Sequence, residues 1–387
     1  MGGRFLIRIE DTDQKREVEG VAEKLIEQFK ILGIKFDNKP VYQSTRADIY
    51  KKYADILIEK NLAYVDDGAV RFLAPPKTTI TWVDLVKGKM TLPSLERDPV
   101  IMKSTGLPPY NLAHVVDDTL MGVTHVLRGE EWLPSTAEHI QLFHALGFTP
   151  PQYAHLPVIS IIEDGNKRKL SKRKDREALV EYFLSVGYPV DALIEYLLTI
   201  YNTDFELWRI QNPDTPWRDF HFRFEKIGSN SPLFDWDKLN NISANNIAKM
   251  DIKTLMTEIH NFYGDKLTPE QYENVKTLLN IDRGTPRPRK DIVKYADVTT
   301  EFDFLFRPVV LTAELKKYAE IVNAVRDRDE WFAQCKERAT DFGYKNVREF
   351  TQSIRVALTG RERSTDLYTI SKILLAAGSR TETRGAK

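Results

Sequence analysis

The sequence predicts an α/β fold with a doubly wound parallel sheet in its first half, followed by a mostly α-helical second half. Short apolar runs alternate with amphipathic helical patterns up to about Tyr182, and strand signals fade beyond that residue. Between about residues 65 and 102 the pattern changes to short strands and turns broken by prolines, which indicates a small inserted subdomain. We therefore expect three regions, over residues 1–182, 183–252 and 253–387.

Strands and helices follow one another in the first half as a parallel sheet requires. Apolar, β-rich runs predict the strands, and one-sided apolar patterns predict the helices. The strands cover residues 5–9, 123–127 and 156–162, and the helices cover 16–32 and 47–61. Ser135 and Glu138 predict a capping box for a further helix that ends at Leu146 and is closed by Gly147.

The second half is predicted to be helical in two parts, without a repeat period. The predicted helices cover residues 192–199, 247–263, 269–279, 313–329, 330–343, 347–358 and 366–377. Residues 202–218 and 281–290 are predicted to be loops.

The composition is ordinary for a folded protein: 42% of the 387 residues are hydrophobic and 29% are charged. The single cysteine, Cys335, excludes an internal disulfide and a cysteine-based zinc site, and the seven histidines show no metal-ligand spacing. No apolar run is long enough for a signal peptide or a membrane span, so we expect the cytoplasm or an organellar matrix. Basic and acidic side chains number 56 each, so a nucleic-acid partner requires locally gathered basic residues.

A basic loop near the end of the α/β half carries the strongest chemical signal. Residues 167–176 contain seven basic side chains and one acid. Lys169, Ser171 and Lys172 are suited to closing on a triphosphate and stabilising the charge that develops as pyrophosphate leaves. The alternative is a solvated basic turn or a localisation patch, as most basic runs are. The position after a predicted strand favours the phosphate interpretation.

A second candidate site lies at the end of the first strand. Glu10 follows that strand directly, and open parallel sheets bind ligands at the carboxyl ends of their strands. Its carboxylate would receive an ammonium group, and Arg8, on the same face, would accept a carboxylate. Alternatively, Thr12 and Asp13 cap the following helix. Capping is the favoured interpretation for Asp13, but it does not require a carboxylate at Glu10.

Arg128 ends another predicted strand, and its planar guanidinium suits the recognition of a carboxylate. Taken alone, an ion pair with Glu130 or Glu131 explains this arginine equally well. Tyr110 follows two prolines and either offers its hydroxyl to a substrate or is an ordinary half-buried aromatic residue.

Two further features have structural interpretations that we favour. His114 is expected to be a core histidine, and the Asp117-Asp118 pair is expected at a helix N-terminus rather than on a metal ion. In the helical half, a basic cluster lies near three phenylalanines, so RNA binding by stacking is a weaker hypothesis. The cluster comprises Arg283, Arg287, Arg289, Lys290 and Lys294, and the phenylalanines are Phe302, Phe304 and Phe306.

Four blocks of the sequence, in order and at compatible spacing, resemble the glutamyl-tRNA synthetase family of the bacterial or organellar type. The blocks are residues 2–13 (GGRFLIRIEDTD), 110–132 (YNLAHVVDDTLMGVTHVLRGEEW), 155–159 (HLPVI) and 169–175 (KLSKRKD). Residues 231–239 and 355–360 look like the family's stem-contact and anticodon-binding regions. The resemblance implies a Rossmann-type catalytic domain with a small insertion, a stem-contact helical domain and an α-helical anticodon-binding region.

The resemblance implies roles for the candidate residues. Glu10 would bind the α-amino group of glutamate, and Arg128 would recognise a carboxylate. Tyr110 and Arg8 would also line the glutamate pocket. The residues implied to act on ATP are Lys169, Ser171 and Lys172, and those implied to border the adenine are His155, Leu156 and Pro157.

The implied reaction joins L-glutamate to tRNA(Glu) in two steps. ATP and glutamate would form glutamyl-adenylate, and the glutamyl group would then pass to the 3′-terminal adenosine. Magnesium would accompany ATP, and activation in this family usually waits for tRNA to bind. We expect a monomer with no zinc.

The sequence departs from the family in two places. Members begin with a strand and a phosphate-binding motif of two histidines around an Ile-Gly pair, whereas Met1 here directly precedes Gly2-Gly3, so we expect a truncated start. After Tyr64, a short turn replaces a longer insertion that carries zinc in some members.

Two other hypotheses follow from the same residues. A non-catalytic relative that binds tRNA or ATP would fit the missing motif. An enzyme that glutamylates a modified base in tRNA is disfavoured, because that group lacks an anticodon-binding region and tends to depart from the Lys-Leu-Ser-Lys-Arg sequence.

Overall fold

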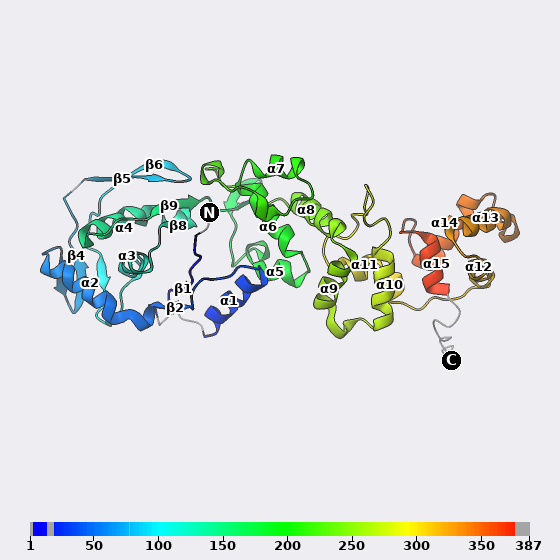
Figure 1. Cartoon of the computed structure of the whole chain (residues 1–387), viewed down its shortest axis with the longest axis horizontal. Coiled ribbons are helices and arrows are strands. Elements are labelled where there is room, and N and C mark those ends of the chain that lie inside the picture. The colour runs from blue at the N-terminus through cyan, green and yellow to red at the C-terminus, as the bar shows by residue number, and fades with distance from the viewer. Residues whose placement is uncertain (1–2, 14–18, 77, 376–387) are drawn as a thin grey trace. The chain divides into compact units, whose positions relative to one another are not determined.

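The computed structural model describes residues 3–13, 19–76 and 78–375, and these form two compact units (Figure 1). The first unit comprises Met1–Glu181 and Glu195–Asp235, and the second comprises Tyr182–Ile194 and Trp236–Lys387. None of the helices in the described part of the chain is both long and apolar enough to cross a membrane. The predicted division into three regions stays a prediction.

A four-stranded sheet with a parallel core organises the first unit, in the order β6-β5-β9-β8. Its strands are β5 (Thr79–Asp84), β6 (Gly88–Pro93), β8 (His125–Gly129) and β9 (Gln152–Leu156). β9 pairs in parallel with both β8 and β5, and β6 runs antiparallel to β5 at the edge. The mixed α/β class with parallel pairing is therefore confirmed, although β5 comes from the segment that the sequence assigned to an insertion.

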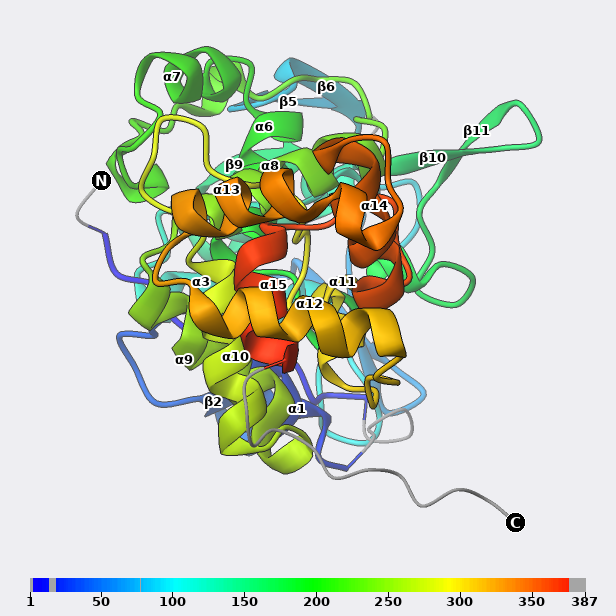
Figure 2. The same ribbon diagram turned by 90° about the vertical axis from the view of Figure 1, so that its right-hand side faces the viewer.

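Three smaller sheets complete the first unit. They are the parallel pair β1 (Arg8–Ile9) and β2 (Val41–Tyr42), the antiparallel sheet of β3 (Ala63–Asp66), β4 (Ala69–Phe72) and β7 (Val100–Met102), and the hairpin of β10 (Ser160–Glu163) and β11 (Asn166–Lys169). The hairpin projects from this unit as a narrow arm (Figure 2). The predicted strand over 156–162 is thus wrong: β9 ends at Leu156, and Pro157, which cannot donate to a ladder, separates it from β10.

The first unit also contains helices. They are α1 (Val21–Ile31), α2 (Ala47–Glu59), α3 (Tyr110–Met121), α4 (Leu133–Leu146) and α7 (Phe205–Gln211), while α5 (Val180–Ser185) and α6 (Val190–Tyr201) contain residues of both units. α7 lies inside the segment predicted as a loop over 202–218, so that prediction is wrong in part. Tyr50, Leu57, Leu112 and Leu142 are fully buried where α2, α3 and α4 meet.

The capping box predicted for α4 does not form. α4 begins at Leu133 with a proline in its first turn, and Ser135 lies inside the helix rather than before it. The Glu138 carboxylate instead accepts a hydrogen bond from the Asn111 amide (2.5 Å). Gly147, with a φ of 80°, closes the helix as predicted.

The second unit is helical. Its helices are α8 (Trp236–Lys249), α9 (Ile252–Tyr263), α10 (Pro269–Leu279), α11 (Asp297–Glu301), α12 (Ala313–Ala324), α13 (Arg328–Arg338), α14 (Val347–Thr359) and α15 (Leu367–Leu375). The single helix predicted over 247–263 is two helices, because Asp251 caps α9 by accepting a hydrogen bond from the Thr254 amide (3.0 Å). Phe302 and Phe304 are only 1% exposed, so the hypothesis that they stack on RNA is wrong.

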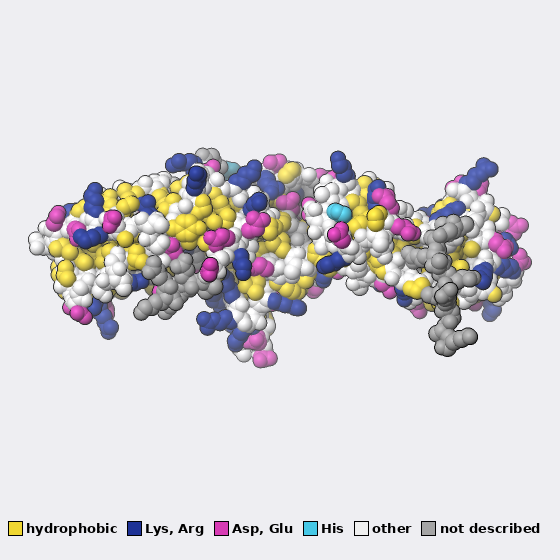
Figure 3. Space-filling view, turned by 90° about the horizontal axis from the view of Figure 1, so that it is seen from below, with side chains coloured by type: hydrophobic (Ala, Val, Ile, Leu, Met, Phe, Trp, Pro, Cys, Tyr) yellow, Lys and Arg dark blue, Asp and Glu magenta, His cyan; other side chains and the backbone are white. Residues whose placement is uncertain are grey.

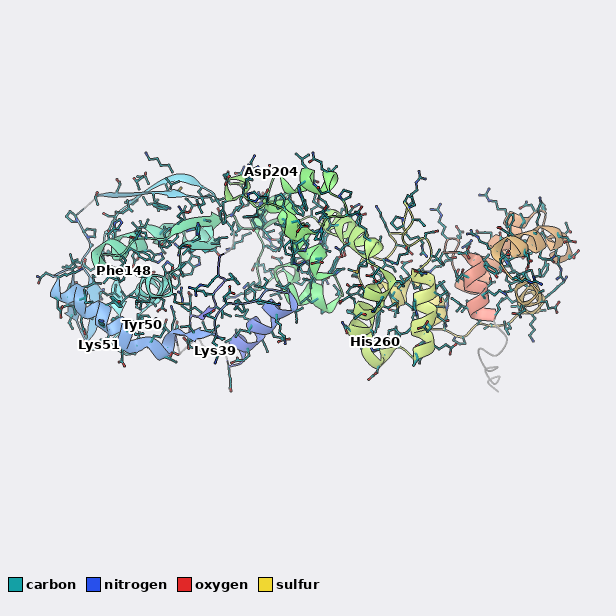
Figure 4. The ribbon with its side chains drawn as sticks, viewed as in Figure 1. Lys39, Tyr50, Lys51, Phe148, Asp204 and His260 are labelled. Atoms are coloured by element: carbon teal, nitrogen blue, oxygen red, sulfur yellow. The ribbon has the colours of Figure 1, made fainter. Side chains whose placement is uncertain are left out.

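Asp117 on α3 joins that helix to the segment from Gln43 to Tyr50, which lies 67 to 74 residues earlier in the sequence. Its buried carboxylate accepts hydrogen bonds from Gln43 (2.9 Å), from Arg46 (2.8 Å) and from the Tyr50 hydroxyl (2.7 Å). Tyr50 lies on α2 and is labelled in Figure 4. Burial, followed by the hydrogen bond to Asp117, raises the pKa of Tyr50. The hydroxyl therefore stays protonated and remains a donor.

Asp117→Ala is expected to destabilise the first unit by about 3–5 kcal/mol, because it leaves a partly buried guanidinium and two further donors without an acceptor. Urea unfolding followed by hydrogen exchange of the 47–59 peptide measures this loss for the first unit specifically. Asp55→Ala is the matched control, because its 2.9 Å ion pair with Lys51 is exposed on α2 and is worth about 1 kcal/mol or less. Equal losses in the two variants would contradict the assigned role of Asp117.

Candidate active site

The first candidate residues meet where β1 ends. The Arg8 guanidinium donates a hydrogen bond to Asp118 (2.7 Å) and lies 3.6 Å from the Glu10 carboxylate. The prediction that Arg8 and Glu10 share a face is therefore confirmed. α1 is described from Val21 onward, and residues 14–18, where the predicted helix over 16–32 begins, lie outside the described residues, so the alternative that Thr12 and Asp13 cap that helix stays a prediction.

The Glu10 carboxylate is the accessible member of this group. Its side chain is 43% exposed, whereas those of Arg8 and Asp118 are 13% and 3% exposed. Burial raises the pKa of Glu10, and the nearby Arg8 opposes this effect. Glu10 thus offers an acceptor to a ligand at the end of a strand, while Arg8 is already occupied by Asp118.

Asp117 and Asp118 lie in the second half of α3, so the expectation that they sit at a helix N-terminus is wrong. Both are buried. Burial raises the pKa of Asp118, and Arg8 opposes that shift. His114 is buried as expected, and its pKa is held well below the ordinary value by burial and then by the charges around it. His114 is therefore an uncharged ring in the core.

Arg128 lies near the end of β8 and is surrounded by uncharged acceptors. Its Nε donates to His155 Nε2 (3.1 Å), and its Nη2 donates to Thr136 Oγ1 (2.8 Å). Longer contacts reach the Tyr110 hydroxyl (3.5 Å), the Trp132 carbonyl (3.5 Å) and His139 Nδ1 (3.3 Å). No carboxylate among the described residues pairs with this guanidinium.

The alternative ion pair with Glu130 or Glu131 is not formed. Glu130 accepts hydrogen bonds from Lys87 (2.6 Å) and from the Val158 amide (3.2 Å). Glu131 lies 3.4 Å from the Lys169 ammonium. Because both carboxylates have other partners, the positive charge of Arg128 is left for a ligand.

Tyr110 lies between the two charged ends of the site. Its ring stacks on His114 (centroids 5.3 Å apart) and contacts Trp132 (4.5 Å). Burial, and then the negative charge of Glu10, raise the pKa of Tyr110, while Arg128 opposes the shift. The phenol therefore stays protonated, and a ligand held by both Glu10 and Arg128 would lie against it.

His155 contacts Arg128, and Asp84 contacts the other side of the His155 ring. The sequence did not predict this arrangement. His155 is fully buried, and its Nδ1 lies 2.5 Å from Asp84 Oδ2. Burial alone would raise the pKa of Asp84, but hydrogen bonds from His155 and from three main-chain amides lower it. One signal was present in the sequence: like Glu10 and Arg128, Asp84 stands at the end of a strand. That residues 155–157 border the adenine stays a prediction.

The basic loop is fixed at its base and exposed at its tip. Arg168 donates two hydrogen bonds to Asp175 (2.7 Å each) and two to Glu163 (2.6 and 2.9 Å). The Ser171 amide also donates to Asp175 (2.7 Å), while Lys172 is exposed and has no partner among the described residues. The loop thus presents Lys172 to solvent from a defined turn.

The described part of the chain contains no group of three or more histidine, cysteine, aspartate or glutamate side chains placed to hold a metal ion.

Comparison with known proteins decides the family. A model for the catalytic domain of class I tRNA synthetases (E and Q) matches residues 1–69 and 67–221. The glutamate–tRNA ligase of Clostridium perfringens (strain 13 / Type A) is 35% identical over 473 aligned positions, which cover 96% of this chain and 86% of that protein. That of Acetivibrio thermocellus is 33% identical, with 96% and 85% covered. The chain belongs to this class I synthetase family.

The fold agrees with that assignment. A crystal structure of a glutamate tRNA ligase from Elizabethkingia meningosepticum, in complex with its amino acid, matches this synthetase with a TM-score of 0.79 and 21% sequence identity. The match covers 96% of this chain and 90% of that one. A crystal structure of glutamate-tRNA synthetase from Elizabethkingia anophelis matches with a TM-score of 0.76.

Arg168→Ala is expected to loosen the basic loop of the synthetase, because it removes four hydrogen bonds that fix the base of the loop. Limited proteolysis with trypsin measures this as faster cleavage after Lys172 and Lys174. Arg71→Ala is the matched control, since Arg71 forms an exposed ion pair with Asp66 (2.6 Å) away from the loop. The same cleavage rate in wild type and Arg168→Ala would show that the anchor is dispensable.

Proposed function

We propose that this chain is a glutamate–tRNA ligase that forms glutamyl-adenylate from ATP and L-glutamate and then transfers the glutamyl group to tRNA(Glu). The observation that carries the proposal is the guanidinium of Arg128, which has five uncharged neighbours and no carboxylate partner among the described residues. Arg128 is partly exposed, so an anionic ligand can reach its guanidinium and form charge-assisted hydrogen bonds with it. The family and the names of the relatives support this assignment.

Glutamate fits a site with one cationic and one anionic end. Arg128 would bind a carboxylate of the amino acid, and Glu10 would bind its α-ammonium group. Tyr110 would lie along the chain between them and offer its hydroxyl, and Arg8 would hold Glu10 in place through their 3.6 Å contact. A planar guanidinium binds a carboxylate through two parallel hydrogen bonds, and an amide cannot accept both of them.

ATP would occupy the neighbouring end of the sheet. Lys169 on β11 lies 3.4 Å from Glu131, which is two residues after the end of β8, so the loop begins beside the proposed glutamate site. Lys172, Lys169 and Ser171 would bind the phosphates. Within the segment from His155 to Pro157, Leu156 would border the adenine, because the His155 side chain is fully buried and faces Arg128. Magnesium would enter with ATP and neutralise part of the phosphate charge.

The first step would be attack of a glutamate carboxylate oxygen on the α-phosphorus. The new P–O bond forms as the bond to pyrophosphate breaks, and negative charge accumulates on the leaving group. The Lys172 ammonium, presented by the fixed turn, would stabilise that charge. In the second step, a ribose hydroxyl of the 3′-terminal adenosine would attack the adenylate carbonyl and expel AMP.

The helical second unit would bind the tRNA. A cavity of about 970 Å³ in this unit is lined by basic and aromatic side chains together with three aspartates. They include Arg289, Arg328, Lys336, Arg355 and Phe332. Phe332 is 49% exposed and is available for stacking, unlike Phe302 and Phe304. Acidic and basic side chains are interspersed on the face drawn in Figure 3, so tRNA binding would depend on local clusters. We expect a cytoplasmic monomer.

The decisive experiment is attachment of labelled glutamate to tRNA(Glu) in the presence of ATP and magnesium. Glutamyl-tRNA that forms only when all three substrates are present would support the proposal. Bound tRNA with no attachment of glutamate would contradict it.

Arg128→Ala should raise the KM for glutamate by about tenfold to a hundredfold, because hydrogen bonds to charged groups contribute about 1.5–3 kcal/mol. The KM for ATP should not change, since the loop contacts are untouched. Steady-state aminoacylation kinetics measure both constants, with Arg71→Ala as the control for loss of an arginine. An unchanged KM for glutamate would remove Arg128 from the site.

Lys172→Ala should slow adenylate formation by about a hundredfold or more, since removal of one donor to a developing negative charge typically costs this much. The KM for glutamate should stay as in wild type. ATP–pyrophosphate exchange in the presence of tRNA measures the step directly. Lys174→Ala removes the same charge from the same loop, and an equal fall in that variant would show that only the total charge matters.

A further inference from the structure

Two histidines face Arg128, and each must offer a lone pair to it. Guanidinium nitrogens only donate hydrogen bonds, so a ring nitrogen beside them must carry no proton. His155 Nε2 lies 3.1 Å from Arg128 Nε, and His139 Nδ1 lies 3.3 Å from Nη2. Both rings must therefore be neutral, with their protons on the nitrogens that point away from Arg128.

The outer nitrogen of each ring meets an acceptor that fixes this tautomer. Asp84 Oδ2 lies 2.5 Å from His155 Nδ1, and Asn111 Oδ1 lies 3.0 Å from His139 Nε2. A carboxylate can only accept, so it requires the proton to be on Nδ1 of His155. Burial and the adjacent Arg128 also lower the pKa of His139 to about 3, which keeps that ring uncharged.

The two oxygens of Asp84 have separate tasks. Oδ1 accepts hydrogen bonds from the main-chain amides of Val86 (3.0 Å), Lys87 (3.0 Å) and His155 (3.2 Å). The first two hold the turn after β5, and the third links that turn to β9. Oδ2 contacts the His155 ring. Replacing Oδ2 alone therefore changes the contact with the His155 ring and leaves the main-chain hydrogen bonds of Oδ1 in place.

We propose that Asp84 and His155 are positioning residues for glutamate recognition: Asp84 holds His155 in the Nδ1–H tautomer, and His155 thereby orients the Arg128 guanidinium. This inference rests on the proposed function, because it concerns how the glutamate site is held. Asp84 acts through His155 and does not contact the substrate.

The arrangement also explains how Arg128 can be fixed without losing its charge. A carboxylate placed directly against the guanidinium would neutralise it and compete with the substrate. The intervening neutral ring orients the guanidinium and leaves the positive charge available. Selection of glutamate over glutamine depends on that charge, so the preference for glutamate should weaken when the His155 tautomer is inverted.

Asp84→Asn is the sharpest test. The amide oxygen can keep the three main-chain hydrogen bonds, while the amide nitrogen takes the place of Oδ2 and donates to His155 Nδ1. The ring proton must then move to Nε2, where it opposes the Arg128 Nε–H. Affinity for glutamate should fall by about tenfold to a hundredfold, as is typical when a partner that fixes a histidine is lost. The preference over glutamine should fall with it, and ATP binding should be unchanged. Isothermal titration calorimetry of the full chain measures all three.

Asp98→Asn is the matched control. Asp98 also accepts a main-chain hydrogen bond on Oδ1, from Ala74 (2.7 Å), and a side-chain hydrogen bond on Oδ2, from Tyr64 (3.0 Å). The variant therefore loses the same charge from a carboxylate with the same kinds of partner, at a more exposed position and without any link to Arg128. An equal loss of glutamate affinity in Asp98→Asn would overturn the proposal.

A double variant tests whether Asp84 acts through the ring. His155→Phe removes the acceptor and should itself weaken glutamate binding. Asp84→Asn combined with His155→Phe should be no worse than His155→Phe alone, because the interaction that Asp84 controls is already gone. Additive losses would show that Asp84 acts by another route and would overturn the proposal.

The tautomer can be observed without any ligand. Nitrogen-15 NMR of labelled histidines, with the His155 signals assigned by their loss in His155→Phe, should show the proton on Nδ1 in wild type and on Nε2 in Asp84→Asn. A proton on Nε2 in wild type would overturn the inference even if a variant fails to fold. Wild type that shows the expected tautomer but binds no glutamate would contradict the proposed function and leave the tautomer assignment intact.

Discussion

The buried carboxylate of Asp117 is the interaction on which the first unit depends, because it fixes α3, which begins at Tyr110, to the segment from Gln43 to Tyr50. Its donors come from 67 to 74 residues earlier in the chain, so it closes long loops as well as satisfying three polar groups. Its neighbour Asp118 binds Arg8 and so fixes the end of β1 beside Glu10. The start of α3 carries Tyr110, which contacts Arg128. One buried acidic pair therefore orders both ends of the proposed glutamate site.

The arginines of the first unit differ in whether a carboxylate neutralises their charge. Arg46 and Arg8 each have a buried carboxylate as partner, and their charges are thereby neutralised in place. Arg128 instead has histidine, threonine, tyrosine and a carbonyl around it, so its geometry is fixed while its charge is not. Hydrogen bonds from a charged donor to neutral acceptors offset part of the desolvation cost. The part of the desolvation cost that these hydrogen bonds do not offset favours binding of an anion.

Sequence patterns predicted the parts of this architecture that depend on local periodicity. The helix over 269–279 and the placement of Glu10 after a strand needed only residues close together in the chain. The partnership of Asp84 with His155 could not be predicted in this way, because the two are 71 residues apart and β5 had been assigned to an insertion. Ser135 failed as a cap for a related reason: α4 already begins at Leu133, with Pro134 in its first turn, and Glu138 is occupied by Asn111 from another helix.

The basic loop combines a fixed base with a free tip, and its electrostatics keep that arrangement over a wide range of pH. Hydrogen bonds from Arg168 are the main reason why the pKa of Asp175 is lowered to about 2, below the ordinary value of about 4. A carboxylate with a lowered pKa contributes stability that is fully present above its ordinary pKa and is lost as the pH falls through the lowered value. The anchor is thus intact near neutral pH, where ATP would bind. Ser171 and Asp175 are already held by their hydrogen bond. Closure of the loop on ATP would therefore require movement only of the residues between them, 172–174. The conformational entropy lost when phosphate binds would be correspondingly small.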